Sequence, residues 1–139
     1  MAKGREFFRA PRPGDIVWCR FPQDKILAPG PKPRPALVVR VGEIDGHCTV
    51  AVAYGTSQRV DDLHAGEFSI TRADRDAFVV AGLSFDTKFD LANVVELPFS
   101  DRWFTVPPGA PYGQTPKLGL LHSSLMRRAA AAHRAAAST

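Results

Sequence analysis

Four histidines and two cysteines are the side chains with the most versatile chemistry in this sequence. His47, His64, His122 and His133 are widely separated, and they lack the short spacing that metal-ligand motifs share. The sequence therefore predicts no metal and no other cofactor. Two histidines can also cleave RNA as general acid and general base. His64, in a polar segment, is the one candidate for that role, and we expect it to be a solvated loop residue instead.

The cysteines carry no motif either. Cys19 and Cys48 do not form a CxxC pair, and a disulfide between them is disfavoured in a reducing compartment. We expect both to be small apolar residues within strands. The sequence also has no Walker A loop, GxGxxG, HExxH or GxSxG motif. The common nucleotide-binding and hydrolase sites are therefore not predicted.

The charge distribution is uneven, although the net charge is only +4. Residues 1–40 contain nine Lys or Arg and three Asp or Glu; residues 41–101 contain four and eleven; residues 102–139 contain five and none. If the two basic ends meet in space, they form a positive surface suited to a polyanion. The alternative is that the charges lie on three separate surface regions, where water solvates them.

The hydropathy pattern indicates a chain that stays outside membranes. No apolar stretch approaches the ~18 residues that suggest a membrane span. The basic residues of the first fourteen positions are not followed by the apolar run of a secretory signal. The expected location is the cytoplasm.

Short strands must position any functional side chains. We expect a basic, loosely ordered arm at residues 1–13, followed by a single domain at residues 14–139. Apolar, aromatic and β-branched runs predict the strands of that domain. They lie at residues 16–21, 36–41, 47–54, 68–70, 78–80 and 94–97. Strand follows strand through short connections, which predicts a mainly β fold, a small antiparallel barrel.

Three further segments interrupt or end this pattern. The prolines of residues 22–35 exclude a helix or a central strand, so we expect a loop there. Residues 106–116 are expected to be a linker. Thr115-Pro116 then resembles an N-cap followed by proline at the first helical position, with leucines at helical spacing behind it. This pattern predicts one C-terminal helix at about residues 116–136.

Three short motifs occur in a familiar order. They are Gly-Asp-Ile-Val-Trp at residues 14–18, Lys-Pro-Arg-Pro followed by an apolar run at residues 32–39, and Thr-Ser at residues 56–57. Together they resemble the MazF/PemK-like toxins of type II toxin–antitoxin systems, in a divergent PemK-like branch. Ala-Gly-Leu at residues 81–83 is similar to a later turn of the same family. The resemblance covers residue 13 to about residue 100.

This resemblance implies a fold and a function. The implied fold is an SH3-like barrel of the CcdB/PemK type with a C-terminal α-helix, assembled as a homodimer. The implied activity is that of an mRNA interferase, a metal-independent endoribonuclease that cleaves single-stranded RNA through attack of the 2′-OH. A cognate antitoxin is the implied protein partner. Two alternatives remain: a non-catalytic binding module or inactive toxin relative on the same barrel, and a gyrase poison of the CcdB type.

The resemblance also assigns candidate residues. The family's arginine falls on Arg34 and its threonine on Thr56. A guanidinium can fork onto two phosphate oxygens and stabilise the charge of a phosphorane, and a hydroxyl can orient the scissile phosphate. Without this function, Arg34 would be a surface charge and Thr56 would close a turn. The candidate RNA contacts are Phe21, Lys25, Lys32, Ser57 and Gln58. Of these, Phe21 would stack an unpaired base, unless it and Trp18 serve only in packing.

Overall fold

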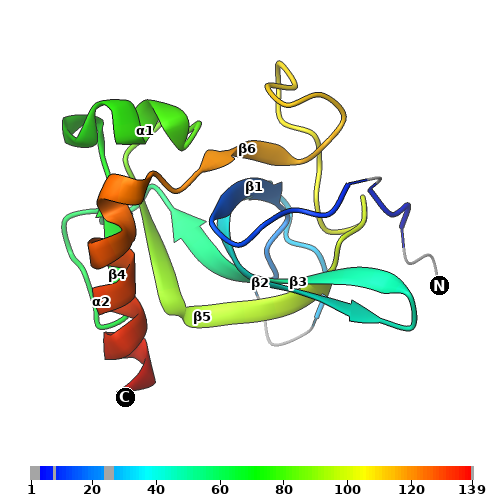
Figure 1. The fold of residues 1–139 in the computed structure, drawn as a ribbon, viewed down its shortest axis with the longest axis horizontal. Coiled ribbons are helices and arrows are strands. Elements are labelled where there is room, and N and C mark those ends of the chain that lie inside the picture. The colour runs from blue at the N-terminus through cyan, green and yellow to red at the C-terminus, as the bar shows by residue number, and fades with distance from the viewer. Residues whose placement is uncertain (1–3, 8, 24–26, 139) are drawn as a thin grey trace.

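Six antiparallel strands form one sheet in the part of the chain that the structure describes, residues 4–7, 9–23 and 27–138 (Figure 1). The structure is a computed structural model. The strands lie in the order β4-β5-β3-β2-β1-β6. Their bounds are Asp15–Cys19 (β1), Arg34–Ile44 (β2), His47–Thr56 (β3), Glu67–Ile70 (β4), Thr87–Pro98 (β5) and Lys117–Leu120 (β6). This barrel-like, mainly β architecture with a C-terminal helix confirms the expected fold class.

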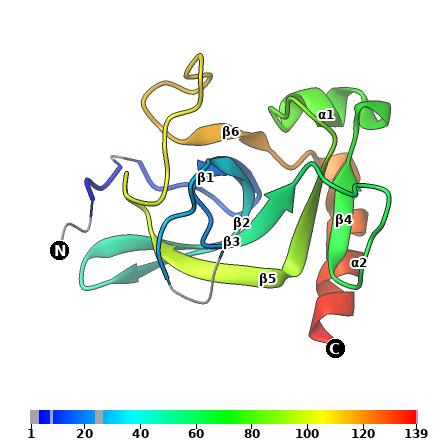
Figure 2. The same ribbon diagram turned by 180° about the vertical axis from the view of Figure 1, so that it is seen from behind.

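Helical segments lie at one end of the sheet. They are the short η1 (Arg72–Asp74), α1 (Asp76–Val80) and η2 (Ser123–Leu125) and the longer α2 (Met126–Ala137). Figure 2 shows α2 packed along β4 and the adjoining end of β5, away from the N-terminus. No helix in the described ranges is long and apolar enough to cross a membrane.

The hydrophobic core lies on both faces of the central strands, because the sheet curls on itself. In β2, Leu37 packs in a cluster that includes Ala129 and Ala132 of α2. The residues on either side of it, Ala36 and Val38, pack in a second cluster on the opposite face. The unbroken apolar run of β2 is therefore buried on both faces, as residues that alternate across a strand require.

The β2–β3 hairpin turns on two residues. Asp45 and Gly46 have φ angles of 51° and 80°, and two left-handed residues in succession form the type I′ turn that matches the twist of paired strands. Ile44 and His47 are the last pair of the ladder. Both strands are therefore longer than predicted, and the connection at residues 42–46 is mostly strand.

The prediction that residues 22–35 contain no central strand is wrong at its C-terminal end. Arg34 and Pro35 open β2, where Pro35 lies opposite Trp18 of β1. Proline is tolerated there because it lies at the start of the strand, where its missing N–H costs no interior ladder bond. The ladder with β3 begins one residue later, at Ala36.

The prediction of a helix from about residue 116 is also wrong, because α2 begins ten residues later at Met126. Lys117–Leu120 instead form β6, which covers the open edge of β1. Gly119 lets the end of α1 pack against this strand, because a Cβ there would lie 2.3 Å from the Val80 carbonyl oxygen. The leucines have helical spacing in the sequence, but spacing carries no information about the unpaired edge of β1, with which this segment pairs.

The strand predicted at residues 78–80 is the end of α1. The Asp74 carboxylate accepts a hydrogen bond from the Thr71 N–H at 2.8 Å, which starts the preceding helical turn. Val79 is 74% exposed, so this apolar run does not pack as a buried strand would. Gly82, with a φ of 71°, turns the chain out of the helix.

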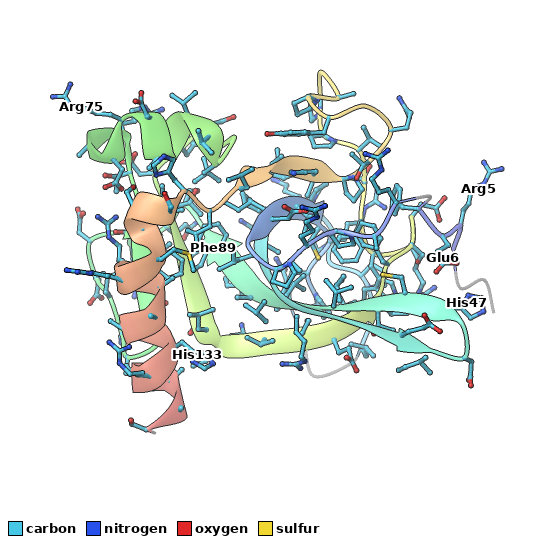
Figure 3. All side chains as sticks on the ribbon, in the orientation of Figure 1. Arg5, Glu6, His47, Arg75, Phe89 and His133 are labelled. Atoms are coloured by element: carbon cyan, nitrogen blue, oxygen red, sulfur yellow. The ribbon has the colours of Figure 1, made fainter. Side chains whose placement is uncertain are left out.

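Residues 4–7 of the N-terminal arm are docked on the sheet rather than loosely ordered. The Glu6 carboxylate accepts a hydrogen bond from the Cys48 N–H at 2.8 Å and lies 3.4 Å from the His47 Nδ1, a pair visible in Figure 3. The Phe7 ring packs on Phe99 with centroids 5.2 Å apart. These contacts attach the arm to the β2–β3 hairpin and to the end of β5.

We expect Gly82→Ala to destabilise the fold much more than Gly109→Ala. Both glycines have positive φ, 71° and 80°, so both substitutions carry the ~1–2 kcal/mol strain of a left-handed residue. A Cβ at Gly82 would also lie 2.0 Å from the Leu118 carbonyl oxygen, whereas at Gly109 nothing lies within 4 Å. Overpacking should cost a further ~1–3 kcal/mol. Chemical denaturation of both variants measures the difference, and equal losses would contradict this packing.

Candidate functional site

A hollow of about 430 Å³ lies where β1, β2 and β3 approach the turn after α1 and the loop that precedes β6. Its walls are mostly apolar and include Trp18, Phe85 and three prolines of the 105–116 loop. Arg34 is the one charged side chain among the described residues that line it. A cationic group against apolar walls is suited to a ligand that combines an anion with a planar ring.

The close approach of two strands brings Arg34 and Thr56 to the same hollow. A Cβ at Gly55 would lie 2.2 Å from the Pro35 carbonyl oxygen and 2.9 Å from the Phe89 ring, so only glycine fits between them. Figure 3 labels Phe89 between α2 and β1. The first residue of β2 and the last residue of β3 thus line one site, although 22 positions separate them in the sequence.

The Arg34 side chain is half-buried and has no partner in the described part of the chain. Its Nε is buried without a hydrogen bond, and no carboxylate of those residues lies within ion-pair distance of its guanidinium. A buried donor left without an acceptor costs about 1–3 kcal/mol. Because the Nε is closed off from solvent, an anion in the hollow would instead bind the terminal nitrogens of the guanidinium, which have no hydrogen bond to the described residues.

The Thr56 hydroxyl oxygen accepts a hydrogen bond from the Gln58 N–H at 3.2 Å. The turn-closing role considered from the sequence is therefore present. That bond occupies one lone pair of the oxygen and leaves the hydroxyl proton available as a donor. Thr56 can close the turn and still bind an anion in the hollow.

A buried ion pair holds the loop that follows Thr56. Lys88 lies opposite Thr56 in the β3–β5 ladder. Its Nζ is 3.1 Å from the Glu67 carboxylate and donates to the Asp62 carbonyl oxygen at 2.9 Å. Both charged side chains are less than a tenth exposed. Because removing one partner would leave the other charge buried and unpaired, the pair keeps this loop in one position.

The predicted RNA contacts separate into different environments. Ser57 is exposed and lines the hollow, whereas Gln58 and Lys32 are exposed but do not line it. Lys25 lies outside the described residues. Phe21 is only 4% exposed and packs on Tyr54 with centroids 5.2 Å apart, so its ring serves in packing and not on the surface.

Two aromatic residues at the hollow were not predicted as site residues. Trp18 is half-buried there, on the strand face opposite to its buried neighbours, and strand alternation was the available signal for it. Phe85 is 66% exposed. The one sequence signal for a role at the surface was that this aromatic residue stands alone in a polar turn. The segment at residues 106–116, predicted to be a linker, supplies a further part of the wall through Pro107, Pro108 and Pro111.

The other candidate chemistries lie elsewhere or are not assembled. His64 is in an exposed loop beside α2, where its backbone N–H donates to the Glu67 carboxylate at 2.7 Å. Both cysteines are free, as predicted. Burial raises the pKa of the Cys19 thiol, and burial together with the nearby Glu6 carboxylate raises that of Cys48. Within residues 4–7, 9–23 and 27–138, no three His, Cys, Asp or Glu side chains are grouped to hold a metal ion.

Comparison with known protein families assigns the chain to a family. The sequence matches the family model described as PemK-like, MazF-like toxin of type II toxin–antitoxin system over residues 12–102, about two thirds of the chain. That range contains Arg34, Thr56 and the Gly82 turn. No curated protein matches the sequence. On the family match, the chain belongs to the PemK-like, MazF-like toxins of type II toxin–antitoxin systems.

Proposed function

We propose that this protein is an mRNA interferase that cleaves single-stranded RNA in the hollow of Arg34 and Thr56 without a metal ion. Toxins of this family are generally endoribonucleases. The observation that carries the proposal is the Arg34 guanidinium, which is half-buried at the hollow and has no ion-pair partner among the described residues. A scissile phosphate would supply the missing anion.

The proposed reaction uses the nucleophile of RNA itself. The 2′-OH loses its proton as its oxygen forms a bond to phosphorus, the bond to the 5′-oxygen breaks, and that oxygen takes up a proton. The products are a 2′,3′-cyclic phosphate and a 5′-hydroxyl. Arg34 donates two parallel hydrogen bonds to the phosphate oxygens, on which negative charge increases in the transition state. The Thr56 hydroxyl donates to the same phosphate or orients the 2′-OH. Trp18 and Phe85 offer rings against which an unpaired base can stack.

The products test the reaction directly. We expect incubation of a long single-stranded RNA with the protein and a chelator to give fragments with 5′-hydroxyl and 2′,3′-cyclic phosphate or 3′-phosphate ends. End-group mapping and primer extension identify both. Cleavage that stops with chelator and returns with magnesium would refute the metal-free mechanism.

Substitutions of Arg34 test the site. Arg34→Ala should slow cleavage by about 10²–10³, the usual effect of removing one preorganised donor to a developing charge. Arg34→Lys should restore little activity, because an ammonium cannot form the two-pronged contact. Thr56→Ala should have a smaller effect, since the Thr56 hydroxyl donates a single hydrogen bond.

Arg40→Ala is the matched control, since Arg40 is an exposed arginine of the same strand. Circular dichroism should show all four variants folded. If Arg34→Ala is folded and cleaves as fast as Arg40→Ala, the active site is elsewhere and His64 is the next residue to test. If neither they nor the parent protein cleaves RNA, the protein is a non-catalytic relative.

We also propose that the protein acts as a cytoplasmic homodimer, controlled by a cognate antitoxin, with the RNA groove along the subunit boundary. A hollow of about 430 Å³ is the size of a small-ligand site, so an RNA strand must extend beyond it onto a neighbouring surface. Light scattering at tens of micromolar should give the mass of two chains. A monomer at that concentration would count against this arrangement.

A further inference from the structure

A second hollow, of about 540 Å³, lies on the other side of the 105–116 loop. It is bounded by the N-terminal arm, β1, β6 and the end of that loop. Three of its lining side chains are cationic: Arg9, Arg12 and Lys117. Arg9 and Arg12 come from the basic N-terminal third and Lys117 from the basic C-terminal segment, so the two basic ends of the sequence meet here.

One carboxylate organises this hollow without neutralising it. Asp15, whose side chain is 11% exposed, lies 3.4 Å from the Lys117 Nζ and accepts a hydrogen bond from the Arg12 backbone N–H at 3.0 Å. The guanidinium groups of Arg9 and Arg12 are exposed and have no ion-pair partner among the described residues. Two of the three cations are therefore available to an anionic ligand.

The rest of the lining is polar or aromatic. The Lys117 ammonium lies 4.6 Å from the centroid of the Tyr112 ring, which keeps this lysine in place between the ring and Asp15. Gln114 and Thr115 add an amide and a hydroxyl at the rim. Uncompensated guanidinium groups beside hydrogen-bonding side chains are the chemistry that binds a phosphodiester backbone.

The two hollows share a wall. Pro107, Pro108 and Pro111 line the hollow of Arg34, and the adjacent Tyr112 lines the basic one. In β6, Leu118 faces the first hollow and Lys117 the second. A ligand that extends out of the Arg34 hollow across this loop would therefore meet the basic hollow next.

We propose that the basic hollow is a second RNA subsite, which binds backbone phosphates of the same strand away from the scissile bond. The proposal rests on the proposed ribonuclease function. Most residues of the lining, among them Arg9, Tyr112 and Lys117, lie outside the residues matched by the family model. The family match by itself therefore does not imply this subsite.

The test compares two double variants with equal loss of charge. Arg9→Ala/Arg12→Ala removes the available cations, and Arg127→Ala/Arg134→Ala removes two exposed arginines of α2, at the other end of the molecule. Each variant is measured against a long 2′-O-methyl analogue of a cleaved RNA and against a five-nucleotide analogue that spans only the cleavage point. Thermal unfolding confirms that both variants are folded.

We expect the Arg9/Arg12 variant to bind the long analogue roughly tenfold more weakly at physiological salt and the short analogue unchanged. The slope of log K against log salt should fall by about 1.4 for the long analogue, since each phosphate contact to a single strand contributes about 0.7. For the long analogue, the Arg127/Arg134 variant should show a smaller loss of affinity and a smaller change in salt slope than the Arg9/Arg12 variant.

Equal binding of the long analogue by both variants would overturn the subsite, even if the parent protein cleaves RNA. Loss of affinity for the antitoxin alone would also overturn it and would make the hollow a protein-binding site. Failure of the ribonuclease itself would appear separately, as a parent protein that cleaves no RNA.

Discussion

The contact between Gly55 and the Pro35 carbonyl is the constraint on which the candidate site depends. Backbones can approach this closely only where one residue lacks a side chain, and any Cβ would meet both that carbonyl and the Phe89 ring. The contact draws the end of β3 over the start of β2. Thr56 is the residue after Gly55, and Arg34 is the residue before Pro35. Backbone packing therefore brings the two side chains to one hollow, without any attraction between them.

A cost in stability accompanies this arrangement. The Arg34 guanidinium is half-buried with one donor unpaired and no carboxylate of the described residues beside it. A partner such as Glu67, which neutralises Lys88 nearby, would have stabilised the fold but would compete with an anionic substrate. Proteins keep such uncompensated donors where charge develops during a reaction, because a preorganised dipole needs no rearrangement at that moment.

The segments outside the barrel strands complete both hollows. The proline-rich 105–116 loop forms a wall between them, and its prolines limit the conformations that the wall can adopt. The N-terminal arm is held by Glu6, whose pKa is lowered by the hydrogen bonds from the Cys48 N–H and from His47. A carboxyl with a lowered pKa stabilises the docked arm above its unfolded-state pKa and loses that effect as the pH falls through the folded value. Near neutral pH, the arm and its arginines therefore stay in place.

The sequence by itself predicted the fold class and the neighbouring strands at residues 36–41 and 47–54, and its resemblance to a family nominated Arg34 and Thr56 as candidates. Strand alternation, turn residues and short motifs are encoded by neighbouring positions, so they can be interpreted without a structure. The tertiary structure alone decided what depends on contacts between distant segments. Lys117–Leu120 became a strand because the edge of β1 was open, Phe21 became a core residue, and the supposed linker became a wall of the site. Local propensity carries no information about which surface a segment will meet, and packing energies then override it.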